Sequence, residues 1–123
     1  LTGEPTRIEH WVTAERQGQT VAANMLGLGR RYDAVPFFWT EQYGVSLRSV
    51  GHASRWDEVV IDGDLADGDF IARYYEAGVH RASAGVGRDR EILKDERQFE
   101  QRIAEARSGN GNIREPAPAG GIQ

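Results

Sequence analysis

Two runs typical of β-strands stand close together in the second half of the chain, Phe70-Ile71-Ala72-Arg73-Tyr74-Tyr75 and Val79-His80-Arg81-Ala82-Ser83-Ala84-Gly85-Val86. Both are rich in apolar, aromatic or β-branched residues, and only Glu76-Ala77-Gly78 separates them. A glycine-containing connection this short favours a β-hairpin. The pair therefore anchors the expected fold as an antiparallel sheet.

Further strands are expected upstream of this hairpin. Residues 45–50 alternate apolar and polar side chains, and the β-branched run 59–61 ends at the turn signal Asp62-Gly63-Asp64. Short connections of this kind imply antiparallel pairing. We therefore predict an antiparallel β meander of about four strands.

Helices are expected on both sides of the meander. Residues 7–26 and 89–107 place apolar residues at helical spacing; Thr6 and Glu9 fit a capping box for the first helix, and Asp89 can cap the second. Residues 30–44 are expected to form a linker with an aromatic centre. Residues 108–123, rich in Gly, Asn and Pro, are expected to form a disordered tail. The order of elements predicts an α+β fold.

Composition limits the classes of function. The chain has 123 residues, a net charge of −4 and no cysteine. The acidic balance argues against nucleic-acid binding, and the absence of cysteine excludes disulfides and thiolate metal sites. No apolar run is long enough to span a membrane and no signal peptide is present, so we expect a cytoplasmic protein. Because the chain opens at Leu1 without methionine and soon enters a well-patterned helix, we expect a piece of a longer protein.

Several strings resemble catalytic or binding motifs but fail on context. In Gly85-Val86-Gly87-Arg88 the third glycine of a dinucleotide loop is replaced by Arg90, and the acidic run 62–69 lacks the spacing of a calcium loop. His10, His52 and His80 have no metal-ligand spacing, and no serine occupies a nucleophile elbow. We therefore predict no metal site and no catalytic residue, and an enzyme acting through His52 or His80 has little support.

Two aromatic clusters are the stronger candidates for a binding site. Glu9-His10-Trp11 is expected in the first turn of the first helix, where free backbone N–H groups and the helix dipole favour electron-rich groups. Phe37-Phe38-Trp39 offers a second flat surface. Both clusters fit the walls of a planar ring such as a flavin, and both fit an ordinary hydrophobic core; spacing alone leaves the choice open.

A family resemblance rests on these same residues. Residues 7–18, Arg-Ile-Glu-His-Trp followed by Ala14, Gln17 and Gly18, resemble the last FAD-contacting helix of oxygenase-coupled ferredoxin reductases. Those proteins are relatives of putidaredoxin reductase and of biphenyl-dioxygenase ferredoxin reductase, with apoptosis-inducing factor as a more distant cousin. Residues 36–43, Pro-Phe-Phe-Trp-Thr-Glu-Gln-Tyr, resemble the family's Pro-aromatic-Phe-Trp-Ser-Asp-Gln motif, and residues 50–57 resemble its Val-Gly strand end and acidic turn. The similarity covers residues 5 to 105.

The resemblance implies the C-terminal domain of an NAD(P)H-dependent FAD flavoprotein that reduces a [2Fe–2S] ferredoxin. Glu9, His10, Trp11 and Trp39 are then expected near the flavin. Phe37 and Phe38 are expected where the ferredoxin docks. Because ferredoxins of this kind are usually acidic, a local basic patch is also expected there, and its candidates are Arg30, Arg31, Arg48, Arg88 and Arg90. Phe37 stands where the family commonly has tryptophan, which puts its docking role in doubt, and Thr40 and Glu41 replace serine and aspartate.

The same resemblance divides the chain into three parts. Residues 1–29 would be the last helix of an upstream FAD domain, residues 30–107 the C-terminal reductase domain, and residues 108–123 the tail. Both dinucleotide loops lie upstream in the family and are absent here, so the chain alone is expected to bind FAD weakly and to catalyse nothing.

A different class of function starts from the apolar face of the first helix. If the chain stands alone, that face needs a cover, and a homodimer that swaps residues 1–30 would supply one. The alternative is thus a non-catalytic interaction or dimerisation module.

Overall fold

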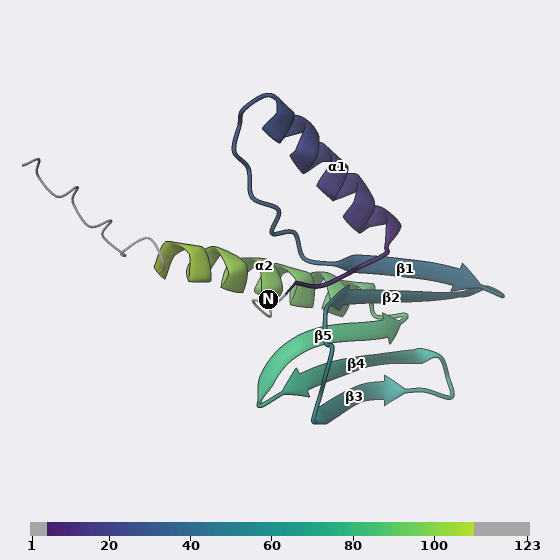
Figure 1. The fold of residues 1–123 in the computed structure, drawn as a ribbon. Helices are drawn as coiled ribbons and strands as arrows, with labels where there is room; N and C mark the ends of the chain where they lie inside the picture. Colours follow the sequence, from purple (N-terminus) through teal and green to yellow (C-terminus); the bar gives the residue numbers. More distant parts are fainter. Residues whose placement is uncertain (1–4, 110–123) are drawn as a thin grey trace, which may run out of the picture.

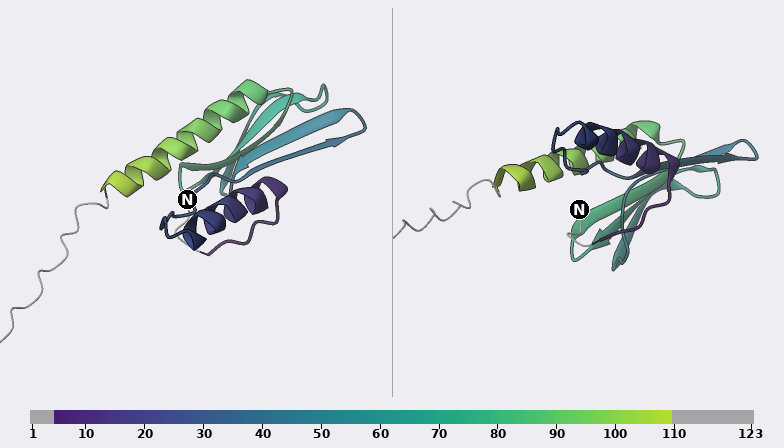
Figure 2. Two further views of the ribbon diagram at one scale, coloured as in Figure 1. Left: turned by 90° about the horizontal axis from the view of Figure 1, so that it is seen from above. Right: turned by 45° about the horizontal axis from the view of Figure 1, so that its top comes forward.

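A computed structural model describes residues 5–109 of the chain, which form a five-stranded antiparallel sheet and two helices (Figure 1). The elements are α1 (Trp11–Met25), β1 (Phe37–Gln42), β2 (Val45–Gly51), β3 (Glu58–Asp64), β4 (Asp69–Glu76), β5 (Val79–Val86) and α2 (Asp89–Gly109). The two helices flank the sheet (Figure 2). The predicted α+β class is confirmed.

The strand order is β1-β2-β5-β4-β3, and every neighbouring pair is antiparallel. The predicted hairpin is confirmed as β4 and β5, and β3 joins it in a three-stranded meander. β2 pairs with β5 rather than with β3, so the last strand lies at the centre of the sheet.

The linker predicted over residues 30–44 is wrong in its second half. Residues 37–42 pair with residues 45–50 as the hairpin β1-β2, joined by Tyr43 and Gly44, which both have positive φ. In the hairpin turn Gln42-Tyr43-Gly44-Val45, the two central residues adopt the positive φ values that tight two-residue hairpin loops favour. The sheet therefore has one strand more than the four expected.

Both predicted helices form; the start of the first is shifted, and the second begins at residue 89 as predicted. The first begins at Trp11 rather than at residue 7, and His10 occupies the N-cap position without a side-chain capping bond, so the Thr6–Glu9 capping box is not formed. Asp89 is the first residue of α2 rather than its cap, and its carboxylate pairs with Arg48 at 2.8 Å. α2 also extends through residues 108 and 109, while the rest of the predicted tail lies outside the described residues.

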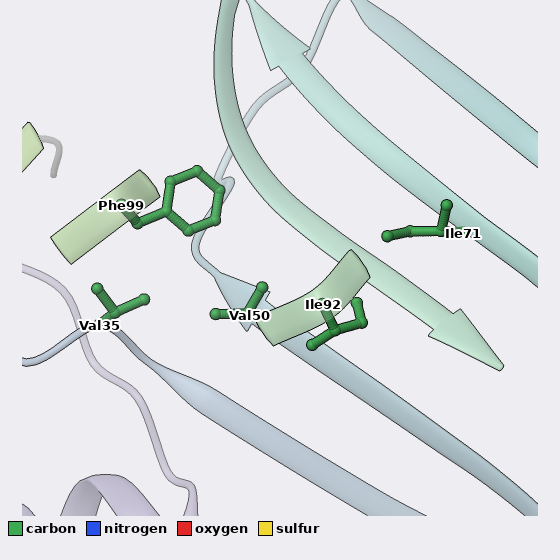
Figure 3. Packing of buried hydrophobic residues seen from close by; sticks show 5 residues of the cluster. All are labelled: Val35, Val50, Ile71, Ile92 and Phe99. Atoms are coloured by element: carbon green, nitrogen blue, oxygen red, sulfur yellow. The ribbon is translucent and has the colours of Figure 1, made fainter. Parts of the chain in front are cut away.

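The core lies between α2 and the sheet. Ile92 and Phe99 from α2 point toward Val50 of β2, Ile71 of β4 and Val35 from the segment before β1 (Figure 3). All five are at most 1% exposed. Burial of these side chains supplies most of the driving force for joining α2 to the sheet.

α1 is attached differently from α2. The side chains that α1 turns toward the rest of the chain are mainly polar: Thr13 is buried, and Arg16 donates to the Val35 carbonyl at 3.2 Å. The apolar side chains of Trp11 and Met25 are 81% and 83% exposed. The apolar face predicted from the sequence therefore faces outward in this chain.

Candidate functional site

The candidate site lies where α1 begins beside β1. The His10 ring lies 4.7 Å from the Phe38 ring, centroid to centroid, with a tilt of 34°. His10 is the N-cap residue of α1 and has an extended backbone. Its carbonyl accepts the first hydrogen bond of the helix, from the Ala14 N–H at 3.0 Å. The stacked pair thus fixes the helix start against the strand.

Two buried polar atoms at this helix start have no hydrogen-bond partner among the described residues, His10 Nδ1 and Thr13 Oγ1. A buried polar group without a partner costs about 1–3 kcal/mol, so native proteins nearly always provide one. The first backbone N–H groups of a helix are also free of intrahelical partners. This helix start therefore offers polar groups suited to an electron-rich ligand.

Two indole rings near this helix start and strand are open to solvent. Trp11 is 81% exposed on α1, and Trp39 is 51% exposed on β1. Trp39 lies 6.5 Å from the Phe37 ring, and no ring contact joins it to Trp11 within residues 5–109. Glu9 is exposed and pairs with Arg7 at 3.3 Å. Of the four predicted flavin-facing residues, only His10 is substantially buried.

The four predicted docking residues divide into two pairs. Phe37 and Phe38 are half-buried: Phe37 packs against the core, and Phe38 lies under His10. Arg30 and Arg31 are exposed and line a shallow pocket of about 200 Å³ together with Arg16 and residues of the α1 surface. The structure thus separates an aromatic surface from a basic one.

The basic pocket has a fixed rim. The Arg30 backbone N–H donates to Asn24 Oδ1 at 2.6 Å, and Asn24 Nδ2 donates to the Arg30 carbonyl at 2.8 Å. The one acidic side chain in the lining, Asp33, pairs with Arg107 at 2.6 Å. Since Asp33 is engaged elsewhere, the arginines leave the pocket positively charged.

A buried polar network joins β4, β5 and α2, and sequence patterns gave no sign of it. Asp95 Oδ2 accepts hydrogen bonds from Arg73 Nε at 2.9 Å and from the Ser83 hydroxyl at 2.7 Å. His80 Nε2 lies 2.8 Å from the same hydroxyl, and burial, the largest cause, lowers the pKa of His80. Although this set contains Ser, His and Asp, Ser83 is 0% exposed, so a substrate does not reach it. The network is structural.

Gly51 explains the Val-Gly strand end noted in the sequence. Its φ is +82°, and a Cβ built there would lie 2.4 Å from the Arg81 carbonyl oxygen and 2.8 Å from Phe99 Cε2. Only glycine fits this close approach between β2, β5 and α2. The motif therefore serves the packing behind the site rather than ligand contact.

Residues 5–109 contain neither a metal-binding cluster nor a membrane-spanning helix. No group of three His, Asp or Glu side chains there is placed to hold a metal ion. No helix in the described part of the chain is long and apolar enough to cross a membrane.

Comparison with known proteins adds sequence relatives. Apoptosis-inducing factor 3 from Mus musculus is 37% identical over 87 residues, covering 71% of this chain and 14% of that protein. The anthranilate 1,2-dioxygenase system ferredoxin–NAD(+) reductase component from Burkholderia cepacia is 39% identical over 94 residues, covering 72% of this chain and 23% of that protein. Putidaredoxin reductase from Pseudomonas putida is 36% identical over 70 residues, covering 57% of this chain and 17% of that protein. The chain thus spans less than a quarter of each relative.

Solved structures agree with these relatives. The covalent complex of putidaredoxin reductase with putidaredoxin matches with a TM-score of 0.71 and 31% identity, covering 76% of this chain and 22% of that one. The ferredoxin reductase for the CYP199A2 system from Rhodopseudomonas palustris matches with a TM-score of 0.69 and 35% identity, over 74% of this chain and 22% of that one. The family model described as Reductase C-terminal matches residues 37–110. The chain therefore belongs to the family of reductase C-terminal domains found in ferredoxin reductases.

Proposed function

We propose that this chain is the C-terminal part of an NAD(P)H-dependent FAD flavoprotein that passes electrons to a [2Fe–2S] ferredoxin. The names of the relatives support the reaction class, and the match to a reductase bound to its ferredoxin supports the kind of partner. The single observation that carries the proposal within this chain is the start of α1. Two buried polar atoms there lack hydrogen-bond partners within residues 5–109, and the helix carries an exposed indole in its first turn.

His10, Trp11, Trp39 and Glu9 are proposed to form one wall of the flavin pocket. FAD, when bound, supplies the acceptance of a hydride and the release of single electrons. The residues of this chain supply indole surfaces, unpaired hydrogen-bonding atoms and exclusion of water from the ring. His10 is held in place by Phe38, so its Nδ1 position is fixed before a ligand arrives.

Trp39 gives the direct test of this wall. In the flavin-loaded full-length protein, Trp39→Ala is expected to raise flavin fluorescence, because a nearby indole quenches the excited ring. Trp39→Phe should give an intermediate value. Trp56→Ala is the matched control, since Trp56 is similarly exposed at 55% but precedes β3 at the far side of the sheet. Equal fluorescence in the wild type and Trp39→Ala would reject the placement.

Residues 1–29 are proposed to belong with the upstream FAD domain, and residues 30–107 to form the C-terminal domain. The outward position of Trp11 and Met25 supports this division, because large apolar side chains at the surface indicate a missing cover. An FAD domain that precedes α1 would provide that cover.

Arg30 and Arg31, with the aromatic edge of β1, are proposed to receive the ferredoxin. Opposite charge across an interface raises the association rate and makes it sensitive to salt. Replacing both arginines by alanine should raise the KM for ferredoxin at low ionic strength and flatten its salt dependence. Reduction of ferricyanide, a small acceptor, should be unchanged. Arg97→Ala, an exposed arginine on α2, is the control. An unchanged KM in the double variant would remove the arginines from the docking surface.

A second candidate, a homodimer that swaps residues 1–30, rests on the same exposed face of α1. Light scattering on the 123-residue chain separates the two ideas. A dimer would favour the swap, while a monomer with an ordered α1 would exclude it.

A further inference from the structure

The outer strand β3 forms an open edge of the sheet opposite the β1 edge (Figure 1). Its seven residues pair with β4 in continuous register from Glu58 opposite Tyr75 to Asp64 opposite Asp69. All seven are exposed, and no strand of the described chain pairs with the outer side of β3. A full row of backbone N–H and C=O groups is thus available to another strand.

Few of the usual protections of an edge strand are present on β3. The strand has no proline, lysine or arginine and no bulge against β4, and its centre consists of Val59, Val60 and Ile61. These three side chains are 40%, 42% and 48% exposed. An edge this regular and apolar is suited to pairing with a further strand.

The two faces of β3 differ in character. Three acidic residues of β3 lie on the face of the sheet that α2 covers: Glu58, Asp62 and Asp64. Their partner positions on β4 include the buried Ile71. Arg73, which stands opposite Val60, also points to this face because it bonds to Asp95 of α2. Successive strand residues alternate between faces, so Val59 and Ile61 lie on the opposite face. One side of the edge therefore carries three carboxylates with Val60 among them, and the other side carries the apolar Val59 and Ile61.

The apolar side continues beyond the strand itself. The Trp56 ring meets the Tyr74 ring edge-on at 5.4 Å and 73°, and Tyr74 stands opposite Val59. Trp56 is 55% exposed. Together Trp56, Val59 and Ile61 form an exposed apolar strip along the edge.

The acidic side keeps its charge. Arg73 is bound to Asp95, and Arg88 is bound to Asp69 and Glu91. Within the described chain Glu58 and Asp62 take part in no ion pair, although the pKa of nearby Arg88, which its hydrogen bond to Asp69 raises most, is raised further by the charge of Asp62. A strand added at this edge would place its side chains directly beside those two carboxylates.

A second copy of the same edge is a poor occupant. In an antiparallel pair of two β3 strands centred on Ile61, Glu58 of each copy faces Asp64 of the other, and centring on Val60 puts Glu58 opposite Asp62. Like charges directly opposite each other destabilise a strand pair. The acidic residues therefore act against self-pairing.

We propose that the β3 edge binds an extended segment of another protein in which basic and apolar residues alternate. Backbone hydrogen bonds would add that segment to the sheet as a sixth strand. Its lysine or arginine side chains would lie beside Glu58 and Asp62, and its apolar side chains would pack along Trp56, Val59 and Ile61. The basic side of the partner would thus face Glu58 and Asp62, with Val60 between them, and its apolar side would face Val59 and Ile61.

The test uses blocked peptides and the 123-residue chain. The probe is Lys-Val-Lys-Val-Lys-Val-Lys; the controls are its block isomer, four lysines followed by three valines, and the acidic analogue Glu-Val-Glu-Val-Glu-Val-Glu. Binding is followed by backbone amide NMR at low and high salt. We expect binding of the probe alone, shifts confined to β3, the β3–β4 turn and the neighbourhood of Trp56, slowed exchange at alternate β3 amides, and weakening with salt.

Charge reversal sharpens the test. Glu58→Lys/Asp62→Lys should bind the acidic analogue and bind the basic probe at least about tenfold more weakly, since two cross-strand charge pairs change sign. Glu58→Gln/Asp62→Asn, which preserves the shape of both side chains, should lose the preference without gaining the reverse one. Equal binding of all three peptides, shifts centred on the β1 edge or α2 instead of β3, no binding of the probe at millimolar concentration, or concentration-dependent dimerisation through β3 would each overturn the proposal.

Discussion

Replacing Asp95 by alanine should detach α2 from the sheet more effectively than any surface change on the same helix. Asp95 is 3% exposed and accepts hydrogen bonds from Arg73 at 2.9 Å and from Ser83 at 2.7 Å. Alanine would leave a guanidinium and a hydroxyl without their acceptor. Breaking a buried ion pair from one side costs about 3–5 kcal/mol.

The lower end of that range applies here. The Arg73 side chain is 22% exposed, so water can partly replace the lost carboxylate. A loss of about 3 kcal/mol, divided by a urea m-value of roughly 1–1.5 kcal/mol/M for a small domain, lowers the unfolding midpoint by about 2–3 M. Urea titration followed by circular dichroism measures this shift.

Matched variants identify the cause of the loss. Asp95→Asn keeps one acceptor oxygen, which can take the place of Oδ2 for both donors, but loses the charge, and should cost roughly 2 kcal/mol. Adding Arg73→Met to Asp95→Ala removes the unpaired guanidinium, so the double variant should be more stable than the sum of the single effects predicts. Lys94→Ala, exposed and adjacent, should stay within about 0.5 kcal/mol of the wild type. If Asp95→Ala were as mild as Lys94→Ala, the network would not hold α2.

Two further predictions concern the same packing. Burial lowers the pKa of His80, so the unfolded chain binds a proton at higher pH than the folded chain does. The free energy of unfolding should therefore fall as pH drops below about 6.5. His80→Gln should flatten this pH dependence in urea titrations from pH 8 to pH 5, and an unchanged slope would contradict the assignment. In Gly51→Ala, a φ of +82° is combined with a Cβ that would lie 2.4 Å from a carbonyl oxygen. The loss in unfolding free energy should therefore exceed the value of about 1–3 kcal/mol that backbone strain alone would cause. Gly78→Ala has similar φ, +73°, with nothing within 4 Å, so it should show that strain only, and equal losses for the two variants would refute the packing argument.

Local patterns were sufficient for most of the fold. The glycine turn at 76–78, the alternation at 45–50 and the helical spacing of 89–107 each report structure formed between near neighbours, and each element is present. The α1 start was misplaced because Thr6 and Glu9 fit a cap that the chain does not use. β1 was missed because the turn at Tyr43-Gly44 lacks a strong signal, and Tyr43 adopts a positive φ that is uncommon for tyrosine.

Long-range contacts limit how much of the candidate site can be predicted from the sequence. The sequence grouped Glu9-His10-Trp11 and Phe37-Phe38-Trp39 separately, but only the fold shows that His10 lies on Phe38 while Trp11 and Trp39 remain exposed. The Asp95 network joins residues 12 and 22 positions apart, so no local pattern could reveal it. Burial of an aromatic residue in these clusters depends on the residues that pack against it, and sequence periodicity does not identify those residues.

The proposed flavin relay is tested most directly by the visible spectrum of the full-length protein that carries this segment, before and after NAD(P)H is added under anaerobic conditions. We expect bound FAD, with bands near those of free flavin that bleach on addition of NAD(P)H and recover when a [2Fe–2S] ferredoxin is supplied as acceptor. A full-length protein that purifies without flavin and does not take it up, or whose flavin is not reoxidised by any ferredoxin, would contradict it.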